Sequence, residues 1–245
     1  MRVLVTGGAG FIGSHSVDAL LAGGTEVVVL DNFSTGKTAN LPSHARLTLE
    51  RGDIRNRPDV AGAIVGCTHV LHLAAQVSVR ASVEDPPGSA QHNVLGFVNV
   101  LDAARRAGVK RVVYASSASA FGDPGELPLS ESSPLAPLSP YGLEKSCNEQ
   151  YAALFKQIFG LSALGLRYFN VYGPRQDPAS PYTGVINKFA DRLRAGQPLT
   201  VFGDGGQTRD FIFVKDVARV NVAALAACRM ARCASAPGTA LRCSD

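Results

Sequence analysis

The chain has 245 residues, of which 46% are hydrophobic and 18% charged, and its formal net charge is +4. This composition excludes an intrinsically disordered chain, which has fewer apolar residues and more net charge. No apolar run approaches the ~20 residues that cross a bilayer, and no block of Lys or Arg indicates a nucleic-acid groove. We find no secretory signal at the N-terminus. We therefore expect a cytoplasmic protein that binds neither nucleic acid nor a membrane.

Cysteine is used sparingly and without a pattern. The five residues Cys67, Cys147, Cys228, Cys233 and Cys243 are odd in number. They also lack the close pairs and neighbouring His of a zinc site. We therefore expect free thiols in a reducing compartment and no bound metal.

Short apolar runs alternate with helical patterns in residues 1–168. Runs that are apolar on both faces are typical of a parallel sheet covered by helices on each side. The alternation therefore predicts a doubly wound α/β domain of the Rossmann type. The predicted strands are 2–5, 26–30, 47–50, 69–73, 111–115 and 162–167, and the predicted helices are 11–22, 88–107 and 140–159.

The rest of the chain has a different character. Residues 122–140 are rich in Pro, Gly and Ser, which indicates a loop. Residues 169–227 are expected to form a small, incomplete substrate-binding region, with a helix at 183–195 and strands at 199–202 and 210–213. Residues 210–227 are candidates for packing back against the first domain. Residues 228–245 show no periodicity and predict an irregular tail.

A glycine-rich turn joins the first predicted strand to the first predicted helix. In TGGAGFIG, Gly7, Gly10 and Gly13 are three residues apart. Missing side chains let the backbone approach a pyrophosphate, and the helix N-terminus presents free N–H groups to it. Asp31, 18 residues past Gly13, ends the second predicted strand. A carboxylate there can accept the ribose hydroxyls and repels a 2′-phosphate, which favours NAD over NADP.

A Tyr and a Lys lie four residues apart in YGLEK, at the start of the predicted helix 140–159. This spacing places Tyr141 and Lys145 on one helix face. A nearby ammonium stabilises a phenolate, so we expect Lys145 to make the phenol a usable base. The serines of SSAS, residues 116–119, follow the fifth strand at the edge where ligands bind in this fold. One of them can hydrogen-bond a substrate hydroxyl.

The motifs TGGAGFIG, SSAS and YGLEK, in this order, resemble the extended short-chain dehydrogenase/reductase family. With RYFNVYGPRQDP at 167–178 and GDGGQTRDFIFVKDV at 203–217, the chain is similar to NAD-dependent nucleotide-sugar epimerases of the UDP-glucose 4-epimerase type. The resemblance implies 4-epimerisation of a UDP-hexose, either UDP-glucose and UDP-galactose or their N-acetyl forms, through a transient 4-keto sugar. It also implies a homodimer formed through the helices at 88–107 and 140–159.

The resemblance also assigns roles to individual residues. The catalytic group would be Ser117, Tyr141 and Lys145. The substrate would meet Ser117, Ser119, Tyr141, Asn170 and Arg209. The cofactor would meet Gly7, Gly10, Phe11, Ile12, Gly13, Asp31, Asn32, Asp53, Ile54, Leu73, Ala74, Ala75, Asn93, Tyr141, Lys145 and Tyr168.

The C-terminal part departs from the family, whose members are longer, and the chain is expected to be truncated there. Two alternatives therefore stay open beside the epimerase. One is a catalytically impaired remnant that still binds NAD or a nucleotide sugar. The other is a dehydratase or reductase, although dehydratases of this superfamily usually carry an Asp-Glu pair where this chain has Ala118 and Ser119.

Overall fold

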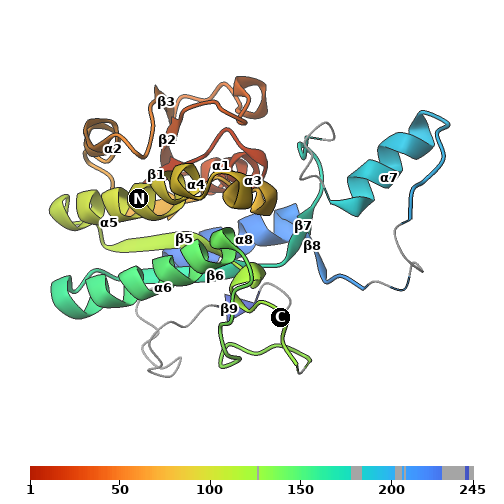
Figure 1. Cartoon of the computed structure of the whole chain (residues 1–245). Coiled ribbons are helices and arrows are strands. Elements are labelled where there is room, and N and C mark those ends of the chain that lie inside the picture. The colour runs from red at the N-terminus through yellow and green to blue at the C-terminus, as the bar shows by residue number, and fades with distance from the viewer. Residues whose placement is uncertain (126, 178–183, 202–205, 207, 228–240, 243–245) are drawn as a thin grey trace.

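A parallel β-sheet forms the centre of the structure, a computed structural model that describes residues 1–125, 127–177, 184–201, 206, 208–227 and 241–242. The sheet has seven strands in the order β3-β2-β1-β4-β5-β6-β9, and every neighbouring pair is parallel (Figure 1). The order in which the strands are added to the sheet reverses between β1 and β4, which is the topology of a doubly wound fold. The predicted fold class is therefore confirmed. The strands are β1 Arg2–Thr6, β2 Glu26–Asp31, β3 Leu47–Arg51, β4 His69–His72, β5 Arg111–Ser117, β6 Ala163–Tyr168 and β9 Leu241–Arg242.

Helices cover both faces of this sheet. One face carries α1 (Phe11–Ala22) and α8 (Val214–Ala226), which pack against each other, and the other carries α2 (Arg57–Ala63), α5 (Gly96–Arg106) and α6 (Pro140–Phe159). Within β1, Val3 and Val5 face the first layer and Leu4 faces the second. Burial on both faces explains why the strands are continuous apolar runs instead of alternating ones.

Local signals set the bounds of the helix that carries the Tyr–Lys pair. Ser139 accepts a hydrogen bond from the Gly142 N–H at 3.1 Å and Pro140 occupies the first turn, while Gly160 ends α6 in the left-handed conformation at φ 69°. The predicted helix 88–107 is instead three consecutive pieces. These are α4 Pro86–Ala90, a π-helical turn Gln91–Leu95 and α5 Gly96–Arg106, preceded by α3 Val79–Glu84.

A smaller unit lies beyond the carboxyl edge of the sheet. It contains a two-stranded parallel sheet of β7 (Asn170–Tyr172) and β8 (Phe211–Phe213), and the helix α7 (Val185–Arg194) (Figure 1). From β8 the chain enters α8 and returns to pack on α1. The short 3₁₀ turns are Thr38–Asn40 and Ala118–Ala120. Our division of the chain at residues 168 and 227 stays a prediction.

The C-terminal third differs from the expected structure in two places. The strand predicted at 199–202 is wrong for residues 199–201, which are irregular, and residue 202 lies outside the described residues. Leu199 and Val201 are 38% and 56% exposed, and a strand needs a partner and a buried face to be stable. Of the predicted tail, Leu241–Arg242 pairs with β6, and its other residues lie outside the described ones. No helix in the described part of the chain is long and apolar enough to cross a membrane.

Candidate active site

The glycine turn between β1 and α1 is shaped for close backbone approach. Gly7 has φ 69°, and a Cβ there would lie 2.7 Å from the Ala74 nitrogen. A Cβ on Gly13 would lie 2.1 Å from the Gly7 carbonyl oxygen. Gly10 precedes α1 without a side-chain cap, and the first turn of α1 has no acidic residue. The first N–H groups of this helix are therefore free for an anion such as a pyrophosphate.

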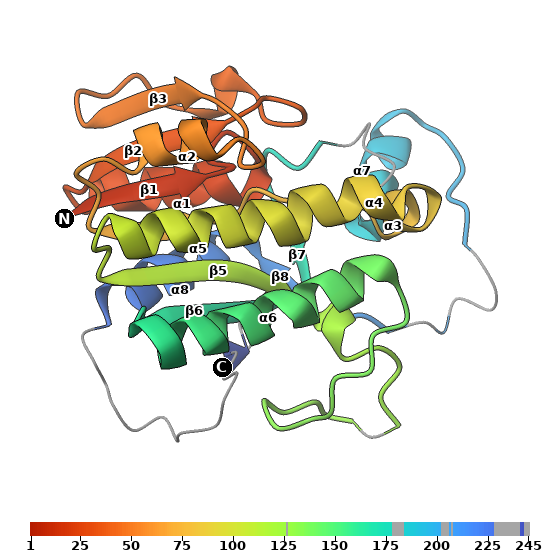
Figure 2. The same cartoon turned by 60° about the vertical axis from the view of Figure 1, so that its left-hand side comes forward.

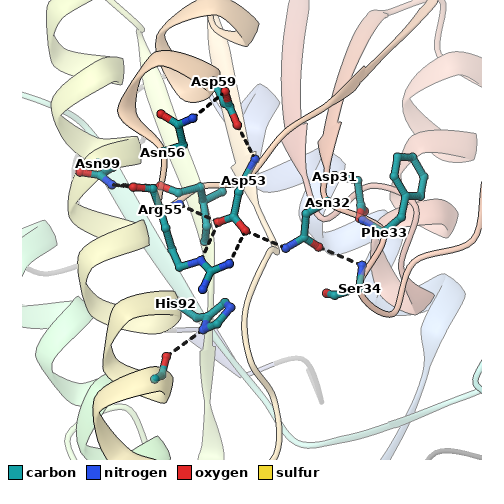
Figure 3. Close-up of polar contacts among 12 residues, drawn as sticks. Asp31, Asn32, Phe33, Ser34, Asp53, Arg55, Asn56, Asp59, His92 and Asn99 are labelled. Carbon is teal, nitrogen blue, oxygen red and sulfur yellow. Dashed lines mark hydrogen bonds and ion pairs between the residues drawn. The ribbon is translucent and has the colours of Figure 1, made fainter.

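Asp31 lies beside this turn at the end of β2. Its side chain is buried, and its two oxygens accept hydrogen bonds from the Ala9 N–H at 2.9 Å and the Phe33 N–H at 2.8 Å. Figure 3 shows Asp31 next to Asn32 and Phe33 at the edge of the sheet. A carboxylate oxygen can accept more than one hydrogen bond, so Asp31 can also accept from ribose hydroxyls. Its negative charge suits NAD, and together with the glycine turn it fits a dinucleotide cofactor.

Asp53 and Arg55 form the next part of this edge. Asn32 Nδ2 donates to Asp53 at 3.0 Å, and Arg55 donates to the same carboxylate through Nε at 3.0 Å and Nη2 at 2.7 Å (Figure 3). The Arg55 bonds hold the pKa of Asp53 well below its ordinary value. The predicted adenine contact by Asp53 would therefore use a carboxylate that already has partners. The Ile54 side chain packs into the core against the α5 layer, and its place beside the adenine stays a prediction.

Residues 73–75 follow β4 and lie against the glycine turn, as the Gly7 geometry shows for Ala74. Ala74 also donates its N–H to Thr6 Oγ1 at 3.3 Å. Asn93 is buried and clamps the next residue of this segment, since its Nδ2 donates to the Gln76 carbonyl at 2.8 Å and its Oδ1 accepts from the Gln76 N–H at 2.9 Å. The structure thus brings the predicted channel residues Leu73 and Ala74 to the glycine turn, and Ala75 follows them in the chain.

The predicted catalytic residues come together where β5 meets α6. Tyr141 is in the first turn of α6 beside the end of β5, where a Cβ on the next residue, Gly142, would lie 2.5 Å from the Ser119 carbonyl oxygen. Ser117 Oγ accepts a hydrogen bond from the Ser119 N–H at 3.1 Å. Lys145 is 3% exposed, donates from Nζ to the Ala115 carbonyl at 3.0 Å, and lies 5.6 Å from the centre of the Tyr141 ring. The phenol of Tyr141, the hydroxyl of Ser117 and the ammonium of Lys145 therefore lie close together at the junction of β5 and α6.

Burial governs the electrostatics of this group. Burial raises the pKa of Tyr141, and Glu144 raises it further, while the hydrogen bond with Ser117 lowers it. Burial also lowers the pKa of Lys145 to about 8. Lys145 is not among the causes that shift the pKa of Tyr141, and its ammonium is held by the Ala115 carbonyl. That Lys145 makes the phenol a usable base therefore stays a prediction.

Two buried acidic residues of α6 were not identified by the sequence analysis. Glu144 is 5% exposed, and its Oε2 accepts from Ser89 Oγ at 2.9 Å and from Asn93 Nδ2 at 2.6 Å. The spacing of Ser89 and Asn93, four residues apart in a helical pattern, was a signal that both face one neighbour. Five residues further along α6, Glu149 binds Arg167 through two bonds of 2.9 and 2.7 Å. These bonds fix α6 against the sheet.

The remaining predicted residues lie in two places. Asn170 donates from both its N–H and its Nδ2 to the Asp210 carbonyl, at 3.1 and 3.0 Å, which places the exposed Arg209 next to it. Tyr168 is buried, and its hydroxyl donates to Asn221 Oδ1 at 2.6 Å on the α1–α8 side. At the start of α1, Ile12 packs against that same layer. Phe11 meets His15 edge to face, with the ring centroids 6.2 Å apart.

Together, the glycine turn, Asp31 and the Tyr141 group define an NAD-dependent enzyme of the Rossmann class. The chain belongs to the NAD dependent epimerase/dehydratase family, whose sequence model matches residues 3–233. In the described part of the chain, no group of three or more His, Cys, Asp or Glu is arranged to hold a metal ion.

Several individual relatives and solved structures that this chain is similar to are named as 4-epimerases of UDP-sugars. The UDP-glucose 4-epimerase of Mycolicibacterium smegmatis is 44% identical over 223 residues, which is 89% of this chain and 71% of that protein. The structure of the Thermus thermophilus UDP-glucose 4-epimerase complex with NAD has a TM-score of 0.85 at 45% identity, and covers 92% of this chain and 74% of that one. The UDP-N-acetylglucosamine 4-epimerase from Methanobrevibacter ruminantium, in complex with UDP-N-acetylmuramic acid, has a TM-score of 0.89 at 40% identity, and covers 92% and 73%.

A buried histidine beside the Lys145 group makes stability depend on pH. His72 ends β4 with its Nδ1 at 2.8 Å from Thr6 Oγ1, and burial lowers its pKa from 6.5 to about 3, helped by the charge of Lys145. Between these values the unfolded chain binds a proton that the folded chain excludes. We therefore expect the free energy of unfolding to fall as pH drops from 6.5 towards 3, by up to about 1.4 kcal/mol per pH unit from this group.

Urea unfolding of the wild type and of His72→Gln at pH 7 and pH 5 measures this effect. The variant should lose less stability between the two pH values than the wild type does. The matched control is His44→Gln, because His44 is exposed and its removal should leave the pH dependence as it is. Equal losses in wild type and His72→Gln would contradict the assignment.

Proposed function

We propose that this chain catalyses NAD-dependent 4-epimerisation of a UDP-hexose, either UDP-glucose and UDP-galactose or their N-acetyl forms. The observation that carries the proposal is the placement of Tyr141 beside the buried Lys145, whose Nζ lies 5.6 Å from the centre of the phenol ring and is bonded to the Ala115 carbonyl of β5, the strand that ends at Ser117. The relatives support the choice of reaction, since several are named UDP-glucose 4-epimerases at 34–44% identity.

Tyr141 and Ser117 have separate roles in the proposed reaction. Tyr141 accepts the proton of the sugar 4-hydroxyl, and Ser117 shares the hydrogen bond so that the hydroxyl is held towards the phenol. Bound NAD supplies the acceptor and later the donor of the hydride at C4. After the 4-keto sugar has rotated in the site so that its other face meets the cofactor, Tyr141 returns the proton to the oxygen at C4. Protons and hydride therefore balance over one cycle, and proton transfer of this kind contributes roughly 10²–10⁴-fold.

Substrate recognition is proposed for Ser119, Asn170 and Arg209. Asn170 and Arg209 are held close by the bonds from Asn170 to the Asp210 carbonyl. The guanidinium of Arg209 is a planar donor of several N–H groups, which suits a diphosphate. Ser119 is bonded through its N–H to Ser117 Oγ, so its side chain is available beside the catalytic hydroxyl. This arrangement supports a nucleotide diphosphate sugar between the two units.

Dehydration of the sugar is the less favoured reaction. It needs an acid and a base in addition to the tyrosine to remove water, and relatives of this type usually carry an Asp-Glu pair directly after the catalytic hydroxyl. Here the positions are Ala118 and Ser119. Glu144 and Glu149, the buried carboxylates of α6, are bonded to Asn93 and Arg167 and are thus committed to holding the helix.

The phenol at position 141 provides the direct test. Tyr141→Phe removes the proton acceptor while it keeps the ring, so we expect kcat for conversion of UDP-galactose to UDP-glucose to fall about 10²–10⁴-fold. Bound NAD, measured in the supernatant of the denatured protein, should stay near the wild-type amount. Tyr151→Phe, on the same helix but packed on the core, is the matched control and should retain its rate. Full activity of Tyr141→Phe would overturn the proposal.

We also propose a cytoplasmic homodimer. The free thiols Cys67 and Cys147 suit a reducing compartment. For the dimer, α5 and α6 lie side by side on one face of the sheet (Figure 2). Apolar residues at the end of the π-helical turn before α5 and along α6 are exposed, namely Leu95 at 49%, Leu143 at 59%, Leu154 at 49% and Ile158 at 64%. Pairing these helices with those of a second copy would bury that surface.

Light scattering tests the dimer, because a protomer has a mass of 25.7 kDa and a dimer twice that. Ile158→Glu should shift the population towards the protomer, since it would bury an unpaired charge between the copies. Val65→Glu, on another exposed apolar residue (67%), is the control and should leave the mass unchanged. A single protomer in the wild type would rule the dimer out.

A further inference from the structure

The segment directly after β7, residues 174–177, crosses from the smaller unit to the cofactor side of the sheet; we name it the 174–177 strap. Its first two residues bind α1. The Pro174 carbonyl accepts a hydrogen bond from His15 Nε2 at 2.9 Å, and the Arg175 guanidinium meets the Asp18 carboxylate at 2.8 Å. His15 and Asp18 are on the helix whose N-terminus is offered to the pyrophosphate, so the strap runs beside that helix.

The other end of the strap binds the loop that follows Asp31. Asp177 forms an ion pair with Lys37 at 2.9 Å. Lys37 is in turn fixed to the glycine turn, because its N–H donates to the Ala9 carbonyl at 3.0 Å, and the Ala9 N–H donates to Asp31. The strap therefore reaches the adenosine end of the proposed cofactor site. Its start lies towards the catalytic end, because β7 follows β6, the strand that pairs with β5 at Ser117.

The strap is held in place by these contacts and not by its own conformational preference. Arg175 has φ 66°, a left-handed backbone conformation that residues with a side chain rarely adopt. The Gln176 side chain accepts a hydrogen bond from Asn187 of α7 at 2.7 Å, which also ties the strap to the smaller unit. Figure 2 shows the teal segment after β7 passing beside the loops at the top of the N-terminal strands on its way to α7.

We propose that the 174–177 strap is a latch that retains NAD, so that the pairs Arg175–Asp18 and Lys37–Asp177 must open before the cofactor leaves. The inference rests on the proposed function. Epimerisation leaves NAD in its starting state after every cycle, so an epimerase has no need to release it. An enzyme that exchanges its cofactor at every turnover would be slowed by such a latch.

The size of the effect follows from the exposure of the two pairs. The side chains are 59% and 40% exposed in Lys37–Asp177 and 32% and 38% exposed in Arg175–Asp18. Partly exposed ion pairs are weak and are screened by salt. We therefore expect loss of one pair to accelerate NAD release about two- to fivefold, and high salt to accelerate release from the wild type in the same direction.

The test measures release of NAD from the purified protein that contains it. The protein is diluted into an excess of alcohol dehydrogenase and ethanol, which convert each released NAD to NADH and report it at 340 nm. Asp177→Asn and Asp18→Asn should each release NAD faster. The double reversal Lys37→Asp with Asp177→Lys should restore the rate to within about twofold of wild type, because it rebuilds the ion pair. Asp216→Asn, which removes an exposed pair with Arg219 on α8, is the matched control.

Wild-type release rates in both single variants would overturn the latch. A reversal variant that releases NAD as fast as the single variants would also overturn it, because the charges would then act on the cofactor itself and not on each other. The assay uses no sugar nucleotide, so a chain that shows the latch but does not convert UDP-galactose disproves only the proposed function. A wild-type chain that binds no NAD disproves both.

Discussion

The whole site depends on the way α6 is seated against the sheet. Three ionisable residues of this helix, Glu144, Lys145 and Glu149, are buried, and each has its partner on another element. A buried charge without a partner is costly, and a buried ion pair tolerates little displacement. The helix therefore has one favourable position. Tyr141, at its first turn, is consequently held against Ser117 of β5.

The position of α6 places the Tyr141 phenol in the site while the phenol still carries its proton. Burial raises the pKa of Tyr141, and Lys145, with its pKa at about 8, still carries a proton at neutral pH. A positive charge close to this phenol, such as the oxidised nicotinamide of bound NAD would carry, would lower its pKa. Geometry thus comes from the folded chain, while the acidity depends on the cofactor that the glycine turn and Asp31 are built to hold.

The sequence predicted the elements whose signals are local. The central strands β1, β2, β4 and β5 are apolar on both faces, and Gly7 and Gly13 stand where a Cβ would collide. Tyr141 and Lys145 share a helix face by spacing alone. Partners distant in sequence could not be read in this way. The bonds of Glu144 to Asn93 depend on how two helices pack, as does the burial that raises the pKa of Tyr141. Residues 199–201 have strand-forming side chains but no neighbour to pair with in the described structure.

The state of the phenol at position 141 tests this account most directly. An ultraviolet difference titration of the wild type against Tyr141→Phe isolates the phenolate signal of this one residue, in protein stripped of NAD and in protein saturated with it. We expect Tyr141 to titrate with a pKa above the ordinary value of 10.0 in the stripped protein and with a lower pKa once NAD is bound. A Tyr141 phenolate that titrates below 10.0 without NAD, or a pKa that NAD does not change, would contradict it.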